Sequence, residues 1–198
     1  MELARSCFER VGVSGKTARP TPTTESFAIE EQTRVLAKEF VYYFAKNAEP
    51  QSHIGVRMRE CVDKLSKEYG AQFDNMISLI DMSKANAVEA LVAIARRLFE
   101  KDGNCNWGRV TILLTFAGYV AGKLTLEGDE NFLDTFASKF ADYLVKTISK
   151  WILQQGGWVS IALVPHRYTT HTLTRAHQAR SQRRGLSLRR FIGSFLNV

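Results

Sequence analysis

The feature that most constrains the fold of this chain is an uncharged, mostly apolar run from Val110 to Val120, interrupted by Thr111 and Thr115. A helix that crosses a bilayer needs about 20 apolar residues, and this run is far shorter. A helix without charges on any face has to be surrounded by other protein. The run therefore predicts a buried central helix over residues 107–124.

Helical periodicity continues on both sides of this run, from Ser26 to Leu163, with few helix-breaking residues. Apolar residues recur at helical intervals in four further segments: residues 26–47, 53–76, 84–101 and 132–148. We place Ala85 on the apolar face of the third segment. The apolar face of the first segment comprises Val35, Leu36, Phe40, Tyr43 and Phe44. Because no strand and no repeat is evident, the fold class is predicted to be all-α.

One folded domain with a segment at each end accounts for the composition. Residues 1–24 are rich in Thr, Ser, Gly and Pro, which predicts disorder; residues 25–163 form the helical domain, and residues 164–198 form a basic tail. The chain has 27 Lys and Arg against 20 Asp and Glu, and the whole excess lies after Leu163. Residues 1–163 thus carry 20 basic and 20 acidic groups. A neutral body disfavours nucleic acid as a partner.

Catalytic, metal and cofactor chemistry find little support. The four histidines lack metalloprotease spacing, no serine or cysteine lies in a recognisable nucleophile motif, and Gly-rich phosphate loops are absent. Cys7, Cys61 and Cys105 are widely spaced, with no zinc pattern and no secretory signal, which fits a reducing cytosol. We expect no enzyme activity, no catalytic or metal-binding residues and no cofactor, although a triad with members far apart in the sequence stays open.

Two tryptophan and glycine segments stand out: Asn106-Trp107-Gly108-Arg109 at the start of the predicted central helix, and Trp151-Ile152 with Gln155-Gly156-Gly157-Trp158 after the segment 132–148. A glycine at the start of an apolar helix costs roughly 1 kcal/mol of helix propensity, so Gly108 indicates that a partner's backbone comes close there. Arg109 places a cation beside that gap, with a solvated surface arginine as the alternative. These segments resemble the first and second homology motifs of the Bcl-2 family, apoptosis regulators whose groove captures a partner's amphipathic helix.

Two earlier segments resemble the other motifs of this family. Phe40-Val41-Tyr42-Tyr43 is similar to the fourth motif, and the order Met58, Cys61, Asp63, Leu65 is similar to the third, whose aspartate meets a groove arginine. The family usually has Gly, Ala or Ser before that aspartate, whereas this chain has Val62, whose branched side chain would crowd a groove. The segment is thus a poor candidate for donation to a partner, and a core helix whose Asp63 is merely solvated remains the alternative.

The resemblance covers residues 30–163 and implies a Bcl-2-like bundle of about eight helices around a buried central hairpin. It also implies a ligand-helix groove lined by the second to fifth helices, in which Arg109 receives the ligand aspartate and Asn106 assists. The expected groove residues are Leu65, Tyr69, Phe73, Met76, Ile94, Leu98, Asn106, Gly108, Arg109, Ile112 and Phe116. A structural set, in which the last two tryptophans clamp two short helices, comprises Trp107, Trp151, Gly156, Gly157 and Trp158.

Two family roles fit this pattern: a pro-survival receptor that sequesters the death-motif helices of pro-apoptotic members, and a Bak-like executioner that oligomerises and permeabilises the mitochondrial outer membrane. Overall similarity favours the executioner. Val62 and the lack of a spanning segment in residues 164–198 favour the receptor, which we prefer. A generic helical adaptor remains a third alternative.

The preferred role implies a cytoplasmic location, with peripheral association with the mitochondrial outer membrane. In the tail, a short apolar stripe stands beside arginines and permits contact with anionic membrane, and a solvated, disordered tail is the equal alternative. The stripe comprises Leu188, Phe191, Ile192, Phe195 and Leu196.

Overall fold

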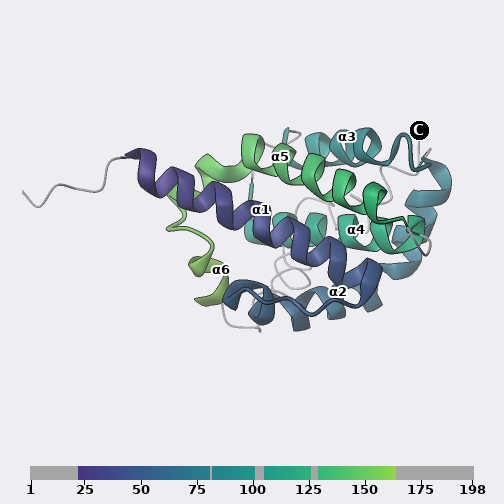
Figure 1. Ribbon diagram of the computed structural model, residues 1–198, viewed down its shortest axis with the longest axis horizontal. Coiled ribbons are helices and arrows are strands. Elements are labelled where there is room, and N and C mark those ends of the chain that lie inside the picture. Colours follow the sequence, from purple (N-terminus) through teal and green to yellow (C-terminus); the bar gives the residue numbers. More distant parts are fainter. Residues whose placement is uncertain (1–21, 81, 101–104, 126–128, 164–198) are drawn as a thin grey trace, which may run out of the picture.

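The computed structural model describes residues 22–80, 82–100, 105–125 and 129–163, and the regular structure within these ranges is six α-helices (Figure 1). They are α1 (Pro22–Lys46), α2 (His53–Leu79), α3 (Ala87–Glu100), α4 (Trp107–Leu124), α5 (Glu130–Gln154) and α6 (Val159–Leu163). The all-α class is confirmed. The predicted disordered residues 1–21 and the predicted basic tail, residues 164–198, lie outside the described residues.

The described ranges contain six helices, whereas the resemblance implied about eight for the bundle, and α2 and α5 each continue without interruption. Helix α2 spans 27 residues and α5 spans 25 residues. No proline interrupts either segment, and a helix continues until a residue or a tertiary contact ends it.

Helix α4 is the buried centre of the bundle, as its uncharged sequence predicts. Helices α1, α2 and α3 pack against α4, and α5 packs against α1 and α3. In Figure 1, α2 follows the lower edge while α3 and α5 follow the upper edge. The hydroxyls of Thr111 and Thr115 donate to carbonyl oxygens one turn earlier, at 2.8 Å each, so neither hydroxyl is left unpaired in the core. Helix α5 is buried on one face only.

Two glycines let α1 and α4 approach closely. A Cβ atom on Gly118 would lie 2.8 Å from the carbonyl oxygen of Phe40, and one on Gly122 would lie 2.8 Å from that of Phe44. A real Cβ would have to move a backbone at either position, so the small residues are required by the packing. Their spacing therefore serves close packing within the bundle.

Helix α1 begins earlier than predicted, at Pro22 rather than near Ser26, so residues 22–24 are helical and not disordered. Proline is well suited to the first turn of a helix because its missing N–H has no partner there. The placement of Val35 on the buried face is wrong, since its side chain is 37% exposed. Leu36 and Phe40, which were predicted on the same stripe, are buried as expected.

Helix α3 begins later than predicted, at Ala87 rather than at residue 84. The carbonyl oxygen of Ser83 accepts hydrogen bonds from two backbone N–H groups, including that of Ala87 at 2.8 Å, which makes a turn before the helix. Ala85 lies in this turn and is exposed, so its predicted place on the apolar face is wrong.

Candidate ligand-helix groove

The first and second tryptophan segments meet in one aromatic cluster. The ring centroid of Trp107 lies 4.8 Å from that of Trp151 and 5.6 Å from that of Trp158. Trp158 is fully buried, and its Nε1–H donates to the Thr33 hydroxyl of α1 at 2.9 Å. Thr33 in turn donates to the carbonyl oxygen of Ile29 at 2.7 Å. The cluster thus joins the start of α4, the end of α5 and the first half of α1.

The paired glycines end helix α5. The N–H of Gly157 donates to the carbonyl of Ile152 at 2.9 Å, and the N–H of Gly156 donates to that of Leu153 at 3.1 Å. This pattern is a Schellman motif, which requires a left-handed residue, and Gly156 has φ +86°. Trp151 lies in the last turns of the long helix α5 rather than in a short helix, so the predicted pair of short helices is reduced to α6 alone.

The two polar residues that the motif predicts for ligand contact begin helix α4. The side chain of Asn106 accepts from the N–H of Arg109 at 2.9 Å, which makes Asn106 the N-cap of α4. The Arg109 guanidinium donates to the carbonyl oxygen of Leu98 at 2.9 Å. Leu98 lies in the last turn of α3, where a cation is favoured by the helix dipole. Arg109 therefore fixes the start of α4 to the end of α3.

Cys105 stands next to this junction and is half-buried. Burial raises the pKa of its thiol to about 11, and the nearby positive charge of Arg109 offsets part of the rise. A thiol with such a pKa stays protonated at neutral pH and is a weak nucleophile.

The apolar residues of the predicted groove come together from three helices. They are Leu65, Tyr69, Phe73 and Met76 of α2, Ile94 and Leu98 of α3, and Ile112 and Phe116 of α4. The ring centroids of Phe73 and Phe116 lie 5.1 Å apart, so α2 and α4 are in direct aromatic contact. All eight side chains are at most 6% exposed. A ligand helix could contact them only after they become exposed. Of the remaining predicted groove residues, Gly108 and Arg109 are partly buried and Asn106 is exposed.

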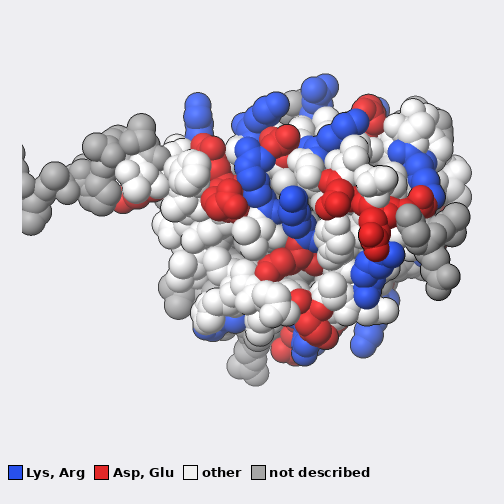
Figure 2. Space-filling view, in the orientation of Figure 1, with Lys and Arg blue, Asp and Glu red and all other residues white. Residues whose placement is uncertain are grey.

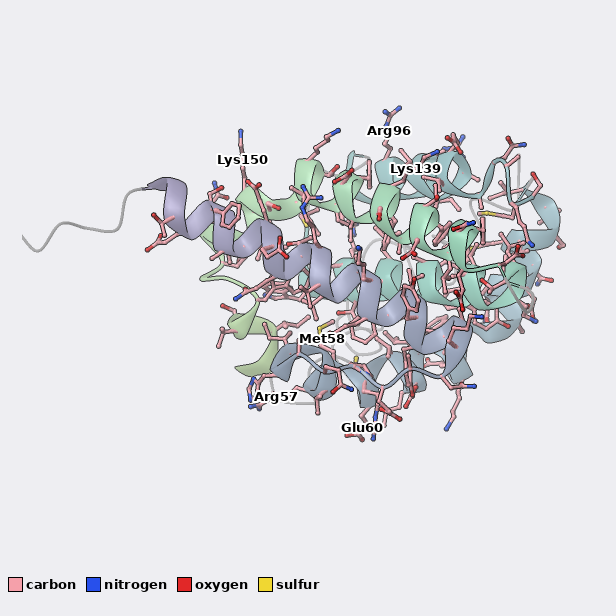
Figure 3. The ribbon with its side chains drawn as sticks, viewed as in Figure 1. Arg57, Met58, Glu60, Arg96, Lys139 and Lys150 are labelled. Atoms are coloured by element: carbon pink, nitrogen blue, oxygen red, sulfur yellow. The ribbon has the colours of Figure 1, made fainter. Side chains whose placement is uncertain are left out.

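The third-motif segment is part of the core of this chain. Met58, Cys61 and Leu65 are at most 5% exposed, and Val62 is fully buried. Figure 3 shows Met58 directed from α2 into the bundle, while Arg57 and Glu60 point away from it. Asp63 is not merely solvated, because the hydroxyl of Tyr43 on α1 donates to its carboxylate at 2.8 Å.

Two residues that the sequence analysis did not single out secure the start of α2. The carboxylate of Glu39 on α1 accepts hydrogen bonds from the N–H of Gln51 at 2.9 Å and from the hydroxyl of Ser52 at 2.6 Å. Ser52 is the N-cap of α2 and accepts from the N–H of Gly55 at 3.0 Å. The serine before an apolar helix is a cap signal that the sequence offers, whereas the contact with Glu39 is tertiary and leaves no local signal.

The described residues offer neither a membrane span nor a metal site. Within these ranges no helix is long and apolar enough to cross a membrane. No three His, Cys, Asp or Glu side chains of the described part of the chain are grouped so that they could hold a metal ion.

Solved structures with a similar fold include two of a pro-survival protein. The zebra-fish pro-survival protein NRZ, in complex with the Bad BH3 segment, superposes with a TM-score of 0.64 and 27% identity, over 73% of this chain and 99% of that chain. NRZ without a ligand superposes with a TM-score of 0.60 and 28% identity, over 71% and 95%.

The similar proteins include an antagonist/killer and an anti-apoptotic protein. Human Bcl-2 homologous antagonist/killer is 27% identical over an alignment of 169 positions, which covers 74% of this chain and 78% of that protein. Anti-apoptotic protein NR13 of Gallus gallus is 27% identical over 132 residues, which are 66% and 74%. The family model "Apoptosis regulator proteins, Bcl-2 family" matches residues 58–158, a span that contains the third-motif segment, the groove residues and the tryptophan cluster. The chain therefore belongs to the Bcl-2 family of apoptosis regulators.

Proposed function

We propose that this protein is a pro-survival regulator that captures the amphipathic death-motif helix of pro-apoptotic family members in a groove between α2, α3 and α4. The observation that carries the proposal is the position of Arg109 at the α3–α4 junction, at the end of an apolar set supplied by three helices. A death-motif helix has complementary chemistry, with spaced apolar residues and one aspartate. The complex of NRZ with the Bad BH3 segment supports this use of the fold.

The proposed binding step begins from a closed site, because the eight apolar groove side chains are buried. Capture therefore exchanges contacts within the protein for contacts with the ligand, and the affinity reflects the difference between the two sets. The Leu98 carbonyl orients the Arg109 guanidinium before the ligand arrives. A ligand aspartate would then form a charge-assisted hydrogen bond with little loss of side-chain entropy.

Calorimetry with a Bad BH3 peptide tests the proposal. We expect submicromolar affinity for this or another death-motif helix, and Arg109→Ala should weaken it by about 1.5 to 3 kcal/mol, or roughly 10- to 150-fold. Arg96→Ala is the matched control, because Arg96 is an exposed arginine of α3 outside the predicted groove. Circular dichroism verifies that both variants are folded. Unchanged affinity of Arg109→Ala would remove Arg109 from the site, and failure of every death-motif helix to bind would favour a generic helical adaptor.

A Bak-like executioner is the second candidate, since the match with the human antagonist/killer extends over an alignment of 169 positions. An executioner has to release its own third-motif segment to a neighbouring molecule. In this chain that segment is core, Val62 is fully buried, and Asp63 is bonded to Tyr43. We therefore expect no release of dye from vesicles of mitochondrial lipid composition when the protein and a death-motif peptide are added together. Dye release that requires the peptide would establish the executioner role.

The proposed role places the protein in the cytoplasm with peripheral association with the mitochondrial outer membrane. Fractionation of cells that express the full chain should recover it in the cytosol and, in part, on mitochondria from which carbonate extracts it. Resistance to carbonate would contradict a peripheral association.

A further inference from the structure

We infer that the folded body of this protein carries its own site for an anionic phospholipid surface, formed by a lysine stripe on α5 and extended by Arg96 of α3. The lysine stripe is defined as Lys139, Lys146 and Lys150. This inference is independent of the proposed groove. It also differs from the expected role of the basic tail, because it concerns residues of the neutral helical body.

The spacing of the three lysines places them on one face of α5. Counted from Lys139, intervals of seven and eleven residues correspond to rotations within about 20° of a whole number of turns. At about 1.5 Å per residue, the stripe is about 16 Å long. All three lysines and Arg96 are exposed, and none of the four forms an ion pair or a hydrogen bond with another described residue. Their charges are therefore available to an external partner.

The one acidic residue among these lysines does not neutralise them. Asp142 lies about 60° around the helix from Lys139 and about 40° from Lys146, and its carboxylate is paired with Arg34 of α1. The Arg34 guanidinium balances the charge of the Asp142 carboxylate on the side of α5 that faces α1. The stripe thus remains basic although residues 1–163 have equal numbers of basic and acidic groups.

Helix α3 adds one exposed cation, Arg96, beside α5, and the exposed Glu89 lies two turns earlier on the same face of α3. The two helices pack against each other, and Arg96 lies on the exposed side of α3. Figure 3 shows Arg96 and Lys150 projecting outwards from the edge that α3 and α5 form, with Lys139 labelled on the same side. In Figure 2, blue side chains stand along this edge of the molecule.

The chemistry of this surface favours lipid headgroups over a protein partner. Protein interfaces rely on exposed aromatic and aliphatic anchors, and the exposed large hydrophobic residues of the described chain lie on α1, α2 and α6. These residues are Phe27, Val35, Val56, Leu79 and Val159. Three of the four basic residues are lysines, which are hydrated point charges without a fixed fork geometry. Such charges suit a plane of mobile phosphates, to which the stripe would adsorb without insertion.

Vesicle sedimentation of the full chain tests the inference at fixed ionic strength. Vesicles of phosphatidylcholine with phosphatidylserine should bind the protein, and vesicles of phosphatidylcholine alone should not. Each basic residue near an anionic surface contributes about fivefold to the partition constant, so Lys146→Gln/Lys150→Gln should weaken binding about 25-fold. The matched control is Lys46→Gln/Lys67→Gln, which removes the same charge from exposed lysines of α1 and α2.

The control variant separates the stripe from net charge and from the tail. The inference predicts that the control retains most of the wild-type partition constant, while the stripe variant loses it. Equal losses in the two variants would assign binding to overall charge, and wild-type binding by the stripe variant would assign it to another part of the chain. No binding to anionic vesicles, or loss of binding when inorganic phosphate replaces chloride at equal ionic strength, would also overturn the inference.

Discussion

The hydrogen bond between Trp158 and Thr33 should make a large contribution to stability, because both residues are fully buried. Thr33→Val preserves the shape of the side chain but removes the hydroxyl that accepts from the indole N–H. A buried donor left without a partner costs about 1 to 3 kcal/mol. Thr33→Ser is the control, since it retains the hydroxyl and loses one methyl group, at a cost of about 0.8 kcal/mol.

A double-mutant cycle isolates this hydrogen bond. In a Trp158→Phe background there is no indole N–H to leave unpaired, so Thr33→Val should cost little there. Urea denaturation followed by circular dichroism gives the four free energies of unfolding, and we expect a coupling energy of about 1 to 3 kcal/mol. If Thr33→Val costs the same in both backgrounds within about 0.5 kcal/mol, the hydrogen bond does not stabilise the cluster and the reasoning is refuted.

Two further predictions concern packing and pH. Gly118→Ala should destabilise the protein by about 1 to 3 kcal/mol in urea denaturation, because its Cβ would lie 2.8 Å from the carbonyl oxygen of Phe40. Gly70→Ala is the control: its Cβ would lie 3.7 Å from its nearest neighbour, so this variant should be neutral or stabilised by up to about 1 kcal/mol. Burial and the hydrogen bond to Asp63 raise the pKa of the Tyr43 hydroxyl from 10.0 to about 12, so folding favours the neutral phenol. The contribution of Tyr43 to the free energy of unfolding should therefore be complete below pH 10 and be lost between pH 10 and 12. Denaturation midpoints measured across this range should fall less steeply in Tyr43→Phe, and an identical slope would contradict the assignment.

The central helix could be predicted from sequence because its signals are local. An N-cap residue, Asn106, precedes an uncharged run, and α4 is observed from Trp107 to Leu124 as expected. The boundaries that were missed depend on other chemistry. The backbone turn at Ser83 delays the start of α3, which periodicity alone does not reveal.

The residues of the candidate site could be predicted from the motif, but their hydrogen-bond partners and their burial could not. The motif places Arg109 one residue after Gly108, yet its hydrogen bond to Leu98 depends on how α3 meets α4. Similarly, Asp63 finds its partner Tyr43 on another helix, 20 residues earlier in the chain. The burial of the groove side chains is likewise a property of the packed bundle, since residue type alone predicts an apolar surface and not whether it is open.

Survival of cells exposed to a death stimulus tests the central claim most directly. If the protein is a pro-survival receptor, expression of the full chain should raise the surviving fraction above that of cells with an empty vector. Gly108→Glu should abolish this protection at equal expression, because its side chain would project where the ligand helix passes, while the control Gly70→Ala should protect as well as the wild type. Lower survival upon expression would contradict the pro-survival role, and full protection by Gly108→Glu would contradict the groove.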